Sequence, residues 1–209
     1  MSQSQRQQRL RLLVRKLNKE RKRQASQIDI LCNDLIGAQR GFIQRLDDIA
    51  FAARFYKSLL GITDLRALLT QADQVIREGL PGADVTFFLR RSDGSGLGAF
   101  HADQAATIDG MPLEDYFPSE LVDAICKSNR PCSVTDLLAL GLQGHVKELR
   151  QVSLATVPLN DLGRPLGFLL ISRDMPSVLT GDELQRVALV TCGLSHAIVA
   201  ARVPLHAGQ

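Results

Sequence analysis

The stretch SLATVPLNDLGRPLGFLLIS, residues 153–172, decides the fold of this 209-residue chain. Residues 153–158 and 166–172 are short, mainly apolar runs, which are typical of buried strands. Between them the residues 160–163 read Asn-Asp-Leu-Gly, and these residue types favour a tight turn. The stretch therefore predicts a β-hairpin of two antiparallel strands.

A second hairpin is predicted upstream, because apolar runs at residues 85–89 and 97–102 flank the turn sequence SDGSG at residues 92–96. The segment between the hairpins is irregular. Its predicted parts are a loop at 103–117, a helix at 119–127, a strand at 132–134, and a helical pattern at 136–152 broken by two glycines.

Helices are predicted at both ends of this region. Gly61 ends the preceding segment, Thr63 caps a helix whose apolar residues run from Leu65 to Ile76, and residues 80–82 stop it. The last helix begins at the capping box formed by residues 180–183 and ends before Pro204. The order helix, hairpin, irregular connection, hairpin, helix predicts an α+β fold with an antiparallel sheet flanked by helices.

A long helix precedes this domain, because residues 6–60 lack proline and contain only two glycines. Its apolar residues follow heptads, with position a at Val14 and position d at Leu17, over about seven heptads, which is typical of a coiled coil. Arg21, Gln24 and Arg45 interrupt the seam. For residues 42–60 an alternative is an amphipathic helix packed on its own domain. We expect a homodimer whose seam contains Val14, Leu17, Ile28, Leu31, Leu35, Phe42 and Ile49.

The charge of the chain is unevenly distributed. Hydrophobic residues make up 45% and charged residues 22%, an ordinary globular composition with a net charge of +3. Residues 1–24 carry nine basic side chains and one acidic one, whereas the remainder carries a net charge of −5. Such a segment attracts nucleic acid, anionic lipid or an acidic protein, although a solvated coiled-coil end is the alternative. The residues expected to meet an anionic partner are Arg9, Arg15, Lys16, Lys19, Arg21, Lys22 and Arg23.

The four cysteines lack a C-x2-C spacing, so neither a metal site nor a redox motif is expected. Cys126 and Cys132 are interpreted as buried core thiols, and a reducing, cytoplasmic location follows. No uncharged apolar run approaches the ~18 residues of a membrane span. Ser195 and His196 are adjacent on a helix and therefore point apart, so they cannot form a triad with Asp182. We expect no catalytic residues and no enzyme activity.

Three stretches give residues 61–203 a resemblance to a GAF domain, a sensory module of signalling proteins. They are residues 62–69 with 82–89, residues 130–136, and residues 154–170 with 179–184. The resemblance divides the chain into a basic arm and coiled coil at 1–60, a GAF-like domain at 61–203, and a tail at 204–209. It implies a ligand pocket on one face of the sheet, roofed by the segment from residue 100 to 151.

The pocket residues implied by this resemblance are Phe100, Asp136, His145 and Thr156. The ligand stays open and the cofactor unknown, because ligands vary widely in the family. Bilin-binding members carry a Cys-His pair where this chain has Gly144-His145, which argues against covalent attachment, and the thiol expected of methionine sulfoxide reductases is absent there too. The expected function is a cytoplasmic regulatory protein that signals through a partner. The alternatives are a ligand-free adaptor, or a coiled-coil protein that binds nucleic acid or anionic membrane weakly.

Overall fold

A computed structural model of the chain describes residues 3–91, 96–101, 107–108, 111–112, 116–142 and 152–202. The chain divides into two compact units, residues 1–49 and residues 50–209. The helix α1 (Gln3–Leu59) provides all of the described part of the first unit and begins the second. The single long helix predicted from the sequence is confirmed.

The second unit is built on a five-stranded antiparallel sheet with the order β2-β1-β7-β6-β5. Its strands are β1 (Ala83–Arg90), β2 (Leu97–Phe100), β5 (Cys132–Ser133), β6 (Val152–Asp161) and β7 (Arg164–Asp174). Two short strands, β3 (Thr107–Ile108) and β4 (Met111–Pro112), pair with each other. The predicted α+β fold with an antiparallel sheet is confirmed.

The β6–β7 hairpin turns through Leu162 and Gly163, which have φ angles of +46° and +81°. Two consecutive positive φ angles belong to the turn type whose twist matches that of the flanking strands. Because this turn is so short, the strands continue pairing to Asp161 and Arg164, beyond the predicted ends. The pairing shifts register between Leu159 and Asn160, where β7 has one residue more than β6.

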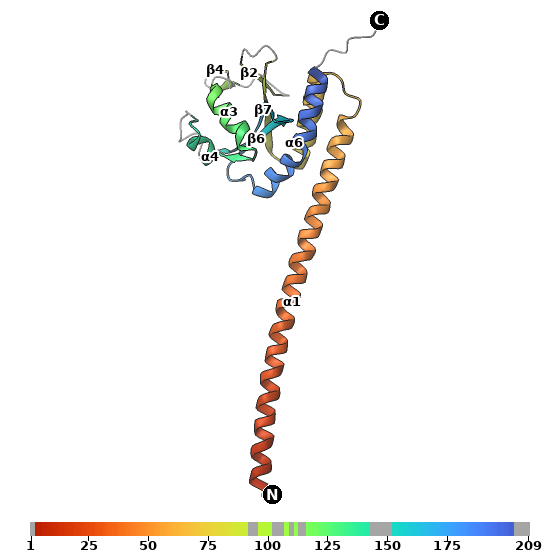
Figure 1. The fold of residues 1–209 in the computed structure, drawn as a ribbon, viewed down its shortest axis with the longest axis vertical. Helices are drawn as coiled ribbons and strands as arrows, with labels where there is room; N and C mark the ends of the chain where they lie inside the picture. The colour runs from red at the N-terminus through yellow and green to blue at the C-terminus, as the bar shows by residue number, and fades with distance from the viewer. Residues whose placement is uncertain are drawn as a thin grey trace. The chain divides into compact units, whose positions relative to one another are not determined.

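Helices cover both faces of the sheet (Figure 1). The helices α2 (Leu65–Gly79) and α6 (Gly181–Arg202), with the end of α1, pack on one face, called the helix-layer face. The helices α3 (Ser119–Ser128) and α4 (Val134–Ala139) cover the other, called the roof face. Core side chains on the helix-layer face include Val85, Phe87, Val157, Leu169 and Ile171. Those on the roof face include Phe88, Cys132, Phe168 and Leu170.

The end of α1 packs on its own domain. Phe51, Phe55 and Leu59 are buried in the core of the helix-layer face. For residues 42–60 the sequence left open an amphipathic helix packed on its own domain, and this description applies from Phe51 onward. It does not apply to Phe42, whose side chain is 62% exposed.

Two local predictions need correction. The helix α2 is capped by Asp64, whose carboxylate accepts a hydrogen bond from the Ala67 backbone at 2.8 Å, and not by Thr63. The strand β5 ends at Ser133 because the Ser133 side chain caps α4, which begins at Val134. At α6 the predicted capping box is confirmed, since Thr180 and Glu183 exchange hydrogen bonds.

The helix α6 is long and apolar enough, by length and composition, to cross a membrane. In this fold one face of α6 packs into the core, because Val187, Val190, Leu194 and Ile198 are fully buried against the helix-layer face.

Candidate functional site

A row of four side chains crosses the roof face of the sheet. Thr86 and Thr156 both pair with Leu170, and Thr156 also pairs with Cys132. Paired residues of antiparallel strands present their side chains on the same face, so the row is continuous across four strands. It places two hydroxyls and one thiol within an otherwise apolar surface.

Thr156 is the unusual member of this row. Its side chain is fully buried, and among the described residues its hydroxyl has no hydrogen-bond partner. A buried hydroxyl without a partner costs about 1–3 kcal/mol, so such groups in folded proteins need an explanation. A bound molecule that supplies the missing partner is one such explanation.

Aromatic side chains fill the other part of the roof face. The Phe88 and Phe168 rings stack with their centroids 4.8 Å apart, and the Phe117 ring lies 5.0 Å from Phe88 and 4.9 Å from Phe168. Leu121 and Ile125 of α3 complete this cluster and are buried. The polar part of the roof face is therefore the row that runs from Thr86 to Cys132.

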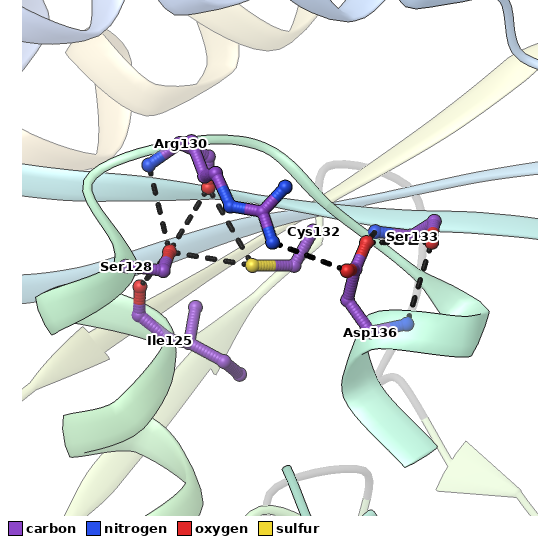
Figure 2. A network of polar contacts seen from close by, with 6 residues as sticks. All are labelled: Ile125, Ser128, Arg130, Cys132, Ser133 and Asp136. Atoms are coloured by element: carbon purple, nitrogen blue, oxygen red, sulfur yellow. Dashed lines mark hydrogen bonds and ion pairs between the residues drawn. The ribbon is translucent and has the colours of Figure 1, made fainter. Parts of the chain in front are cut away.

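A polar network lies beside this row, where α3 is connected to α4 (Figure 2). The Ser128 hydroxyl lies 2.7 Å from the Ile125 carbonyl oxygen and accepts a hydrogen bond from the Cys132 thiol at 3.3 Å. Arg130 forms an ion pair with Asp136 at 3.3 Å. The network fixes the connection that carries β5, so it positions Cys132 in the roof face.

Two titratable groups here have shifted pKa values. Hydrogen bonds from the Ser133 hydroxyl and backbone, with the Arg130 charge, hold the pKa of Asp136 below its ordinary value. Burial raises the pKa of the Cys126 thiol, so it stays protonated at neutral pH. Cys126 and Cys132 are both buried, as expected. A protonated buried thiol is a poor nucleophile.

The structure describes three of the four predicted pocket residues, and two of these, Phe100 and Thr156, lie on opposite faces of the sheet. Thr156 faces the roof, whereas Phe100 lies on the helix-layer face, where its ring packs edge-on against Phe87. Asp136 is the third residue of α4, where its carboxylate completes the capping box with Ser133. His145 lies outside the described residues.

A cleft that the sequence did not indicate lies along β6 beyond the end of β5, between α3 and α6. It has a volume of about 540 Å³, and Phe100, Asp136 and Thr156 do not line it. Its wall combines apolar side chains with groups that can form hydrogen bonds. These include Lys127, Asn129, Arg130, Val157, Pro158, Asn160, Ala188 and Thr191. The cleft forms because β5 is short and leaves part of β6 without a neighbouring strand. Sequence patterns do not determine strand lengths, so they do not indicate this cleft.

The remaining predicted residues lie on α1. The predicted dimer residues are exposed, for example Leu31 at 67% and Leu35 at 68%. The basic residues 15–23 are exposed, and the side chain of Arg9 lies outside the described residues. Within the described ranges no group of three or more metal-ligating side chains is found. Ser195 is buried whereas His196 is exposed, because adjacent residues of a helix point in different directions. The His196 Nδ1 atom lies 3.5 Å from the Asp161 Oδ1 atom.

No protein-family model and no curated protein matches this sequence. Solved structures match its fold. A GAF domain of a phosphoenolpyruvate-protein phosphotransferase from Coxiella burnetii is 18% identical, with a TM-score of 0.55 over 75% of this chain and 95% of that chain. JSC1_58120g3 with bound biliverdin is 20% identical, with a TM-score of 0.53 over 72% of this chain and 98% of that chain.

A third match is the free methionine-R-sulfoxide reductase of Neisseria meningitidis in complex with its substrate. It is 18% identical, with a TM-score of 0.52 over 72% of this chain and 87% of that chain. The sheet domain of this protein therefore has the GAF fold, as its sequence indicated. Matches at such low identity establish the fold and leave the ligand open.

Proposed function

We propose that this chain is a regulatory protein whose GAF-fold domain binds a small molecule on the roof face, beside Thr156. GAF-fold neighbours that carry small molecules, such as JSC1_58120g3 with biliverdin, support this class of function. Binding shifts the population between two arrangements of the helices that flank the domain, in proportion to the difference in affinity for the two. A partner protein reads the result, because we assign no catalytic role to this chain.

The observation that carries this proposal is the fully buried Thr156 hydroxyl, which has no partner among the described residues. A ligand with one hydrogen-bonding group satisfies it, and the neighbouring apolar side chains favour a ligand with an apolar body. The substitution Thr156→Val keeps the shape of the side chain and removes the hydroxyl, which makes it a direct test.

The test is thermal unfolding with a panel of small molecules, comprising nucleotides, amino acids and their sulfoxides, and biliverdin. A ligand at about 100 times its Kd adds about 2.7 kcal/mol of stability, and this raises Tm by roughly 5–10 °C for a domain of this size. We expect Thr156→Val to abolish that rise. Without ligand it should unfold no earlier than the wild type, because an unpartnered hydroxyl has been removed.

Thr191→Val is the matched control, because Thr191 lines the cleft beside β6. If Thr191→Val alone abolishes the rise in Tm, the ligand binds in that cleft and the roof-face assignment is wrong. If no compound in the panel and no extract of cellular small molecules raises Tm, the ligand-free adaptor becomes the better description.

The rest of the proposal concerns setting and partners. We place the protein in the cytoplasm as a homodimer joined through α1. The basic residues 15–23, which are exposed, favour one additional role, weak and salt-dependent attraction of an anionic partner. Because the segment has no aromatic side chain, this attraction should not depend on base sequence.

A further inference from the structure

After Leu35 the apolar stripe of α1 can be assigned to two alternative heptad phases. Up to Leu35 the spacing between successive seam residues alternates between three and four residues, as from Ile28 to Leu31 and from Leu31 to Leu35. Continued unchanged, the next d positions are Ala38, Arg45 and Ala52, which are small or charged. A single step of four after Leu35 instead gives Gln39, Phe42, Leu46, Ile49 and Ala53.

Burial in the second unit distinguishes the two phases independently of the sequence pattern. In the unchanged phase the seam reaches Ala52 and Leu59, and both pack into the core of their own domain. In the shifted phase it reaches Ala53, which is exposed, and the following position, Leu60, lies just after the end of α1. Tyr56, which donates a hydrogen bond to the Leu189 carbonyl oxygen of α6, belongs to both phases, so at this end of the helix Ala53 is the position that favours the shifted phase.

Leu46 supports the same conclusion in the first unit. It is a large apolar side chain, 48% exposed, and the unchanged phase gives it no role in the seam. The unchanged phase instead puts the Arg45 guanidinium into an apolar seam, where a desolvated charge is costly. The shifted phase puts Leu46 into the seam and leaves Arg45 outside it, but it also puts one polar residue, Gln39, into the seam.

We propose that the seam of α1 changes phase by one four-residue step between Leu35 and Phe42, and that a second, parallel copy of this chain occupies the shifted seam. A step of this kind locally unwinds a coiled coil. Gly37 and Gly41 both lie between Leu35 and Phe42, and the space that a Cβ atom would occupy at each is open. The inference rests on the proposed dimer and defines its interface.

A second copy is the occupant for two reasons. Knobs-into-holes packing requires the partner helix to change phase at the same level, and a parallel copy in register does so automatically. The area is also sufficient, because burying a large aliphatic side chain removes roughly 60–120 Å². The nine large seam residues of the first unit then bury about 500–1,000 Å² per chain, against about 800 Å² in a standard interface. They are Leu10, Val14, Leu17, Ile28, Leu31, Leu35, Phe42, Leu46 and Ile49.

Cysteine cross-linking of the full chain tests the phase. In a background carrying Cys32→Ser and Cys192→Ser, which removes the exposed thiols, three single variants are compared: Leu46→Cys, Arg45→Cys and Leu35→Cys. Seam residues of parallel chains in register face each other, so they oxidise to interchain disulfides with copper phenanthroline. Leu35→Cys is the positive control, because Leu35 belongs to both phases.

We expect Leu35→Cys and Leu46→Cys to cross-link at least tenfold faster than Arg45→Cys. Faster cross-linking of Arg45→Cys than of Leu46→Cys overturns the phase change and leaves the dimer intact. A dimer by sedimentation in which none of the three cross-links overturns the parallel pairing. A monomer by sedimentation overturns both this inference and the proposed dimer, whereas ligand binding by the domain is tested separately.

Discussion

At the scale of single residues, Gly167 shows how closely β7 approaches β1. Its φ angle is +144°, and a Cβ at this position would overlap the Phe88 carbonyl oxygen. That oxygen belongs to the backbone of the neighbouring strand, so it cannot move aside as a flexible side chain could. The position therefore requires glycine for both conformation and space.

We expect Gly167→Ala to lower the free energy of unfolding by more than about 3 kcal/mol, because backbone strain and a steric clash add. Gly163→Ala is the control. Gly163 also has a positive φ, +81°, but open space around it, so only the conformational cost of about 1–2 kcal/mol applies. Urea denaturation measures both variants, and equal losses would show that the close approach to Phe88 contributes nothing.

Glu183 makes the stability of the domain depend on pH. Burial raises the pKa of this carboxyl, but the ion pair with Arg173 at 2.9 Å and the hydrogen bonds from Thr180 outweigh that effect and lower it. A carboxyl with a lowered folded-state pKa stabilises the fold above its unfolded pKa of about 4.3. This contribution is lost as pH falls through the folded-state pKa.

The variant Glu183→Gln should therefore be less stable than wild type at pH 7, and the difference should narrow below about pH 4. Arg173 is only 9% exposed, so the loss of its partner carboxylate adds to the effect at neutral pH. Denaturation at several pH values measures the difference. A difference of the same size at pH 7 and pH 3 would contradict the assignment of the lowered pKa to this pair.

At the scale of elements, the proposed coiled coil depends on the exposed seam of α1. Replacing both Leu31 and Leu35 by Asp places two charges per chain in the seam, and we expect a monomer in sedimentation equilibrium. Leu12 and Ile30 are the matched control, because they are also more than half exposed but lie outside the seam. Leu12→Asp with Ile30→Asp should leave the dimer intact, and an unchanged mass for the Leu31/Leu35 variant would exclude this seam.

The sequence predicted the elements better than it predicted their ends. Both hairpins, both flanking helices and the long helix follow from periodicity and turn residues, because those signals are local. The lengths of β6 and β7 depend on how far antiparallel pairing continues, which is a property of two strands together. The same holds for β5, because the Ser133 side chain ends the strand by capping α4.

The placement of the candidate site was harder to predict. Phe100 lies in β2 and pairs with Phe87 of β1, and this register puts its side chain on the helix-layer face. Thr156 lies on the roof face, because the pairing of β6 with β7 fixes which of its residues face that side. Its lack of a partner and the cleft beside β6 arise from tertiary packing, which one sequence does not reveal.

At the scale of the whole molecule, two proposed properties combine: dimerisation through α1 and binding of a small molecule by the GAF-fold domain. In the proposed dimer, a shift in the flanking helices of one domain would be coupled to the second copy, which would make ligand binding useful to a partner. Both properties have to be present in the same particle for the protein to act as a regulator.

Native mass spectrometry of the full chain, after incubation with the small-molecule fraction of a cell extract, tests this claim most directly. We expect a particle of twice the 22.9 kDa chain mass, with an added mass that denaturation removes and that the Thr156→Val variant does not retain. Particles at the mass of one chain, or dimers that carry no added mass in any extract, would contradict it.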